Sequence, residues 1–121
     1  MPNNFTTEPH KERVNKPWGY ELILSPEDSP VTAKILHVNT GARLSLQYHD
    51  QKEEVLTLLS GEALLHLEDE LGAMQQIKME AKKGYLIRAM HKHRIEGVTD
   101  CDIVESSTPE SGNTIRVEDD Y

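Results

Sequence analysis

The chain has 121 residues, a length that suits one domain around one hydrophobic core. Its 21 acidic and 13 basic residues give a formal net charge of −8, which argues against a nucleic-acid partner, because phosphate binding needs a concentrated basic surface. The single cysteine, Cys101, excludes an internal disulfide. No apolar run approaches the ~20 residues of a membrane span and no signal peptide is visible, so we expect a cytoplasmic protein without a membrane partner.

The N-terminal part of the chain differs from the rest in its pattern. Residues 1–15 are polar, with little hydrophobic periodicity, and are predicted to form a flexible arm. Ordered structure is expected to begin with the Lys-Pro-Trp-Gly segment at residues 16–19. The sequence therefore predicts an arm over residues 1–15 and one barrel domain over residues 16–121.

From residue 16 onward the chain divides into short segments separated by turn residues such as Gly, Pro, Asn and Asp. Many of the segments alternate apolar and polar residues or are rich in β-branched residues, as strands are. They cover residues 18–24, 31–38, 43–49, 54–59, 63–69, 73–80, 85–90, 91–98, 101–107 and 114–120. About ten strand-length pieces at this spacing predict an all-β sandwich or barrel.

One stretch is ambiguous. Residues 62–83 are rich in Ala, Leu, Glu, Lys, Met and Gln, so intrinsic propensity alone favours a helix. Gly61, Gly72 and Gly84 divide this stretch into two segments of similar length, which is typical of a hairpin. We expect the hairpin.

The segment between Gly41 and Gly61 contains the clearest candidate site. Arg43, Ser45, Gln47 and His49 alternate with apolar residues, so on one strand all four side chains would lie on the same face. Glu54 follows after a short polar loop, where a returning strand would bring it back to His49. A histidine nitrogen, a carboxylate and an amide oxygen are suitable ligands for a divalent metal ion of intermediate hardness.

The spacing G-x5-Q-x-H-x4-E-x6-G between residues 41 and 61 resembles the first motif of the cupins, in which two His and a Glu bind metal. Residues 88–97 resemble the second cupin motif, with His93 at the position of its metal-binding His. The resemblance implies a double-stranded β-helix, the jelly-roll barrel, and a divalent ion chosen from Zn, Mn, Co, Ni or Fe. The ligands it implies are Gln47, His49, Glu54 and His93.

A narrower resemblance covers most of the chain. The segments KPWG, RLSLQ, HR and RVEDDY, at residues 16–19, 43–47, 93–94 and 116–121, are similar to type II phosphomannose isomerase. That family also has Gln in place of the first motif histidine, and in bifunctional enzymes its cupin domain follows a GDP-mannose pyrophosphorylase domain. The resemblance implies metal-dependent interconversion of mannose 6-phosphate and fructose 6-phosphate.

Further residues are expected around the metal. Arg43 and Ser45 extend the polar row beyond the ligands and would hold sugar hydroxyls or a phosphate, and the resemblance adds Lys16 to this substrate-binding set. It also assigns a catalytic role to Arg116, most easily defended as electrostatic because its guanidinium stays protonated. His91, two residues from His93 on the same predicted face, is a candidate catalytic base.

Two other functions remain open at this level: a cupin oxygenase, which would need iron and free coordination positions, and a non-catalytic module that binds a sugar or sugar nucleotide. In each case the expected partner is a small molecule, an anionic sugar for the isomerase. We also expect a homodimer, because cupins often exchange edge strands and an uncovered sheet edge tends to pair with another chain.

Overall fold

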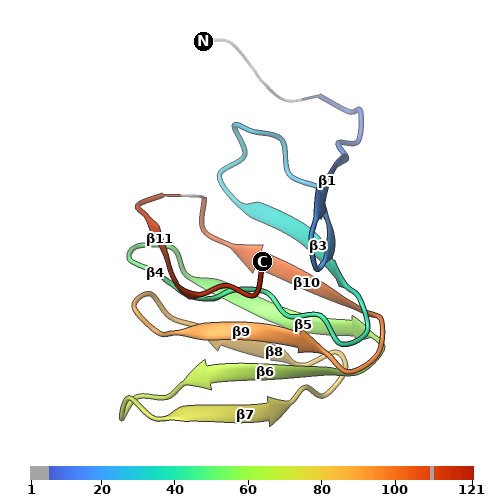
Figure 1. The fold of residues 1–121 in the computed structure, drawn as a ribbon. Helices are drawn as coiled ribbons and strands as arrows, with labels where there is room; N and C mark the ends of the chain where they lie inside the picture. The colour runs from blue at the N-terminus through green and yellow to red at the C-terminus, as the bar shows by residue number, and fades with distance from the viewer. Residues whose placement is uncertain (1–5, 110) are drawn as a thin grey trace.

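A computed structural model describes residues 6–109 and 111–121, and within these ranges the chain forms eleven β-strands and no helix (Figure 1). The all-β prediction is confirmed. No helix of the described residues is long and apolar enough to cross a membrane. Residues 1–5, part of the expected arm, lie outside the described residues.

The strands form two sheets in which all paired strands are antiparallel. The first sheet has the order β1 (Glu12–Lys16), β2 (Gly19–Ile23), β3 (Thr32–Val38), β10 (Cys101–Ser107), β5 (Glu54–Ser60) and β8 (Gly84–Ile87). The second has the order β11 (Thr114–Glu118), β4 (Leu46–His49), β9 (His93–Gly97), β6 (Ala63–Glu68) and β7 (Met74–Lys78). Because strands from opposite ends of the chain pair, β3 with β10 and β4 with β11, distant segments meet in one barrel, the jelly-roll arrangement (Figure 1).

Strand structure begins earlier than the sequence pattern indicates. β1 starts at Glu12, inside the segment expected to be an arm, and pairs with β2 along its whole length. The Arg13 guanidinium lies 3.9 Å from the centre of the Tyr20 ring, a cation–π contact between the two strands. An edge strand can form from polar residues because only one of its sides needs a hydrogen-bonding partner.

The ambiguous stretch is a hairpin, as predicted. β6 and β7 pair in antiparallel register, and the turn between them is organised by Asp69, whose carboxylate accepts hydrogen bonds from the backbone N–H groups of Leu71 and Ala73. Gly72 adopts a φ of 80°, which a glycine tolerates well. This turn chemistry, together with pairing of β6 to β9, overrides the helical propensity of the residues.

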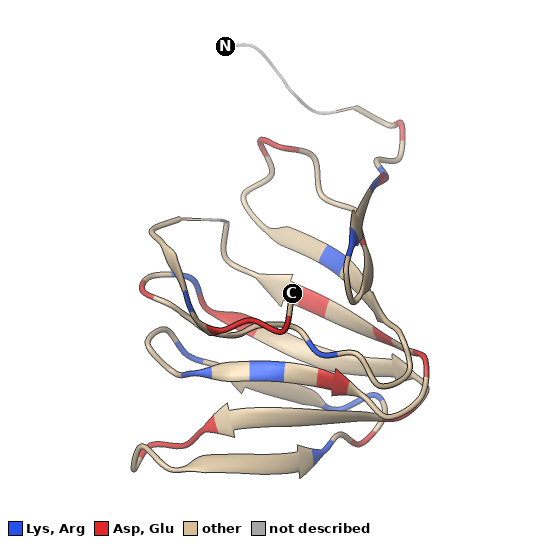
Figure 2. Cartoon of the chain, viewed as in Figure 1, with Lys and Arg blue, Asp and Glu red and all other residues tan. Residues whose placement is uncertain are grey.

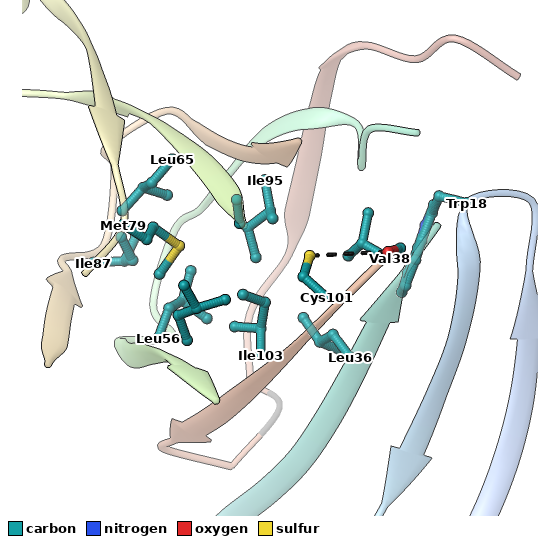
Figure 3. Close-up of a cluster of buried hydrophobic side chains, with 12 residues drawn as sticks. Trp18, Leu36, Val38, Leu56, Leu65, Met79, Ile87, Ile95, Cys101 and Ile103 are labelled. Carbon is teal, nitrogen blue, oxygen red and sulfur yellow. Dashed lines mark hydrogen bonds between the residues drawn. The ribbon is translucent and has the colours of Figure 1, made fainter. Parts of the chain in front are cut away.

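The core lies between the two sheets and comes from alternate residues of the central strands. In β10, Cys101 and Ile103 are buried while their neighbours are less so, and in β5 the buried residues alternate in the same way. Figure 3 shows these side chains meeting those of β6 and β9, with Trp18 at one end of the cluster. Burial raises the pKa of the Cys101 thiol to about 11, so this cysteine behaves as a core residue.

Candidate metal centre and substrate cavity

Three buried side chains from three different strands converge at one end of the barrel. His49 is the last residue of β4, Glu54 is the first residue of β5, and His93 is the first residue of β9. One ligand-type atom from each lies within 4.8 Å of the others. His93 Nε2 is 3.0 Å from Glu54 Oε1, and His49 Nε2 is 3.9 Å from the same oxygen. The short loop between β4 and β5 thus returns Glu54 to His49, and the β4–β9 pairing brings in His93.

The hydrogen bonds of the two imidazoles orient Nε2 toward the cluster. His93 Nδ1 lies 3.0 Å from the backbone oxygen of His91, and because a carbonyl can only accept, Nδ1 carries the proton. In the neutral ring Nε2 then holds a lone pair. His49 Nδ1 lies 2.8 Å from the Thr114 hydroxyl on β11, and this contact orients the ring so that Nε2 faces the cluster. Such outer contacts are typical of metal-ligating histidines.

The cluster fits a divalent metal ion. His93 Nε2 and Glu54 Oε2 are buried and make no hydrogen bond with any described residue, although ion-pairing groups lie nearby. Buried polar atoms are normally hydrogen-bonded, so buried atoms without a hydrogen bond that face a common point indicate a binding position for a metal ion. Two imidazoles and a carboxylate are the donor set that Zn, Mn, Fe, Co or Ni accepts.

Gln47 lies beside this cluster. It is directly opposite His93 in the pairing of β4 with β9, and it borders the same small cavity as Glu54 and His93. Its side-chain oxygen accepts a hydrogen bond of 2.9 Å from the Ser45 hydroxyl. An amide oxygen has two lone pairs, so the second remains available for a metal ion.

The charge of the cluster is balanced by a buried lysine. Lys52 Nζ lies 3.4 Å from Glu54 Oε2 and 3.0 Å from Glu105 Oε2, and all three side chains are at most 8 % exposed. Burial opposes ionisation of Glu54, but His93 and His49 in their protonated, metal-free forms and the Lys52 ammonium together outweigh it and lower the pKa of this carboxyl to about 2. Burial raises the pKa of Glu105, and the negative charge of Glu54 raises it further. Glu54 is therefore a carboxylate, as a metal ligand must be.

A cavity of about 450 Å³ opens next to the metal cluster. His49, Gln47 and Thr114 border it at one side, and Trp18 and Leu36 provide apolar wall. Its cations are Lys16, Lys34, Lys52 and Arg116, and its acidic residues are Glu21, Glu105 and Asp119. The volume is within the range of small-molecule sites.

The structure brings most of the predicted site residues together. Lys16, Ser45 and Arg116 border the cavity together with Gln47 and His49, whereas Glu54 and His93 border the smaller cavity next to Gln47. Arg43 does not: its guanidinium forms an ion pair with Asp120, with Nε 2.8 Å from Oδ2. β4 begins only at Leu46, so the strict alternation expected from residue 43 onward does not extend that far.

His91 also lies elsewhere. It precedes β9, and its Nδ1 donates a hydrogen bond of 2.9 Å to the backbone oxygen of Glu68 at the end of β6. Its side chain borders a separate pocket beside the β6–β7 turn, next to Arg88. The face shared by His91 and His93 in the sequence pattern is absent, because the strand starts at His93.

Sequence reasoning missed several charged residues of the cavity. Lys34 and Glu105 were detectable in principle, because each occupies the core-facing register of its strand, Lys34 with Leu36 and Glu105 with Ile103. A charge in such a register indicates a lined cavity. Lys52 offered no signal, since it lies in a polar loop that reads as exposed.

Comparison of this sequence with known protein families shows a match over nearly its whole length. The family model described as "Mannose-6-phosphate isomerase C-terminal" matches residues 3–120. A search of curated protein sequences found no significant match.

Solved structures with the same fold include the capsular polysaccharide assembling protein CapF from Staphylococcus aureus, 14% identical with a TM-score of 0.77, where 90% of this chain covers 34% of that chain. An oxalate decarboxylase from Lactobacillus farciminis, in a formate complex, is 17% identical with a TM-score of 0.73, and 88% of this chain covers 33% of it. A mutant of the Bacillus subtilis oxalate decarboxylase OxdC is 16% identical with a TM-score of 0.75, and 88% of this chain covers 30% of it.

The chain thus spans about a third of the length of these structures, and at such identities the likeness concerns the fold alone. The family match, in contrast, extends over nearly the whole sequence and includes His49, Glu54 and His93 and the cavity residues up to Asp119. This chain belongs to the mannose-6-phosphate isomerase C-terminal family and has the cupin fold.

Proposed function

We propose that this protein is a metal-dependent sugar-phosphate isomerase that interconverts an aldose and a ketose, with mannose 6-phosphate and fructose 6-phosphate as the first pair to test. The observation that carries the proposal is the buried cluster of His49, Glu54 and His93 beside a cavity bordered by four cationic side chains. The family supports the substrate class.

We assign binding of the sugar oxygens to a metal ion and binding of the phosphate to cationic side chains of the cavity. When bound by His49, Glu54, His93 and Gln47, a divalent ion supplies Lewis-acid polarisation of the carbonyl and hydroxyl oxygens of the sugar. Arg116 is exposed, borders the cavity and makes no ion pair with a described residue, so its guanidinium is available for a phosphate.

Lys16 and Lys34 supply further positive charge to the cavity. Both lie near Glu21, at 3.9 Å and 3.7 Å, distances that leave room for an anion to replace the contact. Lys34 is only 15 % exposed, so folding has already removed most of the water around its ammonium group. This arrangement favours a small dianion over a neutral sugar.

Isomerisation also requires that a proton moves between neighbouring carbons. Glu105 is the candidate base, because its carboxylate is buried, borders the cavity and has a raised pKa, which makes it a stronger proton acceptor than an exposed glutamate. Lys52, at 3.0 Å, holds the carboxylate in place. This assignment replaces the expected role of His91, whose side chain borders a different pocket.

The test is turnover of mannose 6-phosphate by protein loaded in turn with Zn, Mn, Co, Ni and Fe. Wild type is expected to form fructose 6-phosphate, and Arg116→Gln and Glu105→Gln are each expected to lower kcat/KM by about 10²-fold or more. Arg88→Gln is the matched control, because Arg88 is 66 % exposed and lies outside this cavity. Absence of isomerisation of any phosphohexose with every metal would overturn the proposal.

Two further measurements separate the two other functions. Oxygen consumption by the iron-loaded sample alone would favour an oxygenase. Tight sugar binding without turnover, unchanged by His93→Ala, would favour a binding module.

A further inference from the structure

The C-terminal segment changes faces because of a β-bulge. β11 pairs with β4 so that Arg116 lies opposite Gln47, but Glu118 lies opposite Leu46, which leaves Val117 as an extra residue. A bulge of this kind shifts the alternation of side chains by one. Before the bulge the even-numbered residues Thr114 and Arg116 border the cavity.

After the bulge the pattern is reversed. Asp119 and Tyr121 border the cavity, whereas Glu118 and Asp120 turn to the other side, toward arginine side chains. Figure 2 shows the acidic residues of this segment in red next to the end marked C. The bulge therefore lets one short segment present Arg116, Asp119 and Tyr121 to the same cavity.

Two arginines hold the segment in this position through Asp120. Arg43 donates hydrogen bonds of 2.8 Å and 3.0 Å to the two carboxylate oxygens, the paired geometry that is strongest for Arg and Asp. Arg94 Nη2 lies 3.4 Å from Oδ1 of the same carboxylate. We call this set, Arg43, Asp120 and Arg94, the Asp120 clamp.

Arg94 gives the clamp a rigid base. It is only 4 % exposed, although it lies on β9 between His93 and Ile95, and its Nε donates a hydrogen bond of 2.9 Å to the backbone oxygen of Leu44. The Arg43 backbone is bridged to Glu96 on the same strand. The clamp therefore connects the C-terminal segment to the strand that begins with His93.

We propose that Asp119 and Tyr121 determine specificity by contacting the hydroxyl groups of a sugar phosphate, and that Asp120 is a positioning residue that holds both in the cavity wall. The proposal rests on the proposed function of the cavity. A carboxylate beside an anion-binding site contacts the uncharged, hydrogen-donating part of the ligand, because it would repel the phosphate. One oxygen of Asp119 already accepts the N–H of Tyr121, so the other is left for a sugar hydroxyl.

The experiment compares two ligands, mannose 6-phosphate and inorganic phosphate, in the metal-loaded full chain. Trp18 is the only tryptophan of the sequence and borders the cavity, so its fluorescence reports binding of either ligand without turnover. The variants are Asp119→Asn, Tyr121→Phe and Asp120→Asn. Glu118→Gln is the matched control, because it removes one negative charge from the same segment but leaves the pair of Arg43 and Asp120 in place.

The three variants are expected to bind mannose 6-phosphate more weakly than wild type does, but to bind inorganic phosphate equally well. Asp119→Asn and Tyr121→Phe should each raise KM, or the Kd from Trp18 fluorescence, by about fivefold, the effect of losing one hydrogen bond. Asp120→Asn should raise KM about tenfold with kcat changed less than twofold, because the released segment takes both contacts with it. Glu118→Gln should leave both ligands unchanged.

The inference is overturned if Asp119→Asn and Tyr121→Phe leave the affinity for mannose 6-phosphate unchanged, or if Asp120→Asn weakens inorganic phosphate as much as the sugar phosphate. It is also overturned if mannose 6-phosphate binds no more tightly than inorganic phosphate. The first two variants keep the clamp intact, so they decide the matter even if Asp120→Asn fails to fold. If mannose 6-phosphate binds and the variants weaken it as expected, but no turnover occurs, the isomerase function is rejected and the role of Asp119 and Tyr121 in sugar binding is retained.

Discussion

The Nε2 atom of His93 lies 3.0 Å from Oε1 of Glu54, with both side chains only 4 % exposed. A contact of this kind, without hydrogen-bond geometry at Nε2, is what a pair of metal ligands shows when their lone pairs point to a common position. It gives the metal hypothesis a direct test.

His93→Ala is expected to lower the affinity for divalent metal by at least about 10²-fold, because it removes one of few strong ligands from a buried site. Metal content after dialysis against a defined free-metal buffer measures the change. His66→Ala is the control: His66 Nε2 lies 3.0 Å from Glu96 Oε1, so it is also a paired histidine, but it does not border the cavity. Equal metal loss in the two variants would contradict the assignment.

The buried triad of Lys52, Glu54 and Glu105 predicts a large change in stability. Lys52→Met leaves two buried carboxyl groups next to each other without their cation, and the free energy of unfolding of the metal-free protein is expected to fall by about 3–5 kcal/mol. Urea denaturation followed by circular dichroism measures it.

Lys83→Met is the control for this change, because Lys83 pairs with Glu80 in a contact where both side chains are more than 60 % exposed. Its expected cost is at most about 1 kcal/mol. A loss of similar size in both variants would mean that the triad is solvated rather than buried.

The Asp120 clamp is expected to depend on pH. The hydrogen bond from Arg43, and then the charges of Arg43 and Arg94, lower the pKa of Asp120 below its ordinary value of 3.8. A group with a lowered pKa stabilises the folded form above its ordinary value, and this contribution is lost as the pH falls below 3.8 and through the folded-state pKa.

The Nε–H resonance of Arg43 in ¹⁵N NMR spectra should therefore stay constant down to pH 4 and move only at lower pH. In Asp120→Asn the shift at this resonance should be absent, because no carboxylate remains to be protonated. A midpoint at or above 3.8 in the wild type would show that Arg43 does not hold the charged form of Asp120.

Two glycines with the same backbone conformation predict different responses to substitution. Gly61 and Gly72 both have a φ of 80°. A Cβ at Gly61 would collide with the backbone of Asp100 and Cys101, whereas a Cβ at Gly72 meets nothing within 4 Å. Gly72→Ala is expected to cost about 1 kcal/mol from backbone strain alone, and Gly61→Ala at least about 2 kcal/mol more from the collision. Thermal unfolding of the two variants measures the difference, and equal losses would place the Gly61 turn away from β10.

The fold was largely predictable because its signals are local. Alternation of apolar and polar residues defined most of the strands, and Gly61, Gly72 and Gly84 identified the hairpin that helical propensity would have concealed. β1 was missed because an edge strand of polar residues carries no alternation that distinguishes it from an arm.

The candidate site was predictable only in part. Gln47, His49 and Glu54 lie close in sequence, so a turn between two strands sufficed to group them, and a motif resemblance added His93. The contact between Glu105 and Lys52 was not predictable, because it depends on the pairing of β5 with β10, whose residues are about fifty positions apart in the chain.

Most strands, the β6–β7 hairpin and the grouping of Gln47, His49 and Glu54 as candidate metal-binding residues follow from the sequence, since they depend on neighbours along the chain. Which charges border the cavity depends on the tertiary structure. Arg43 is in the expected polar row but is held outward by Asp120, whereas Lys34 enters the cavity from β3. A single extra residue at Val117 reverses the faces of all later side chains, and such a bulge is fixed by pairing with β4, which no local pattern records.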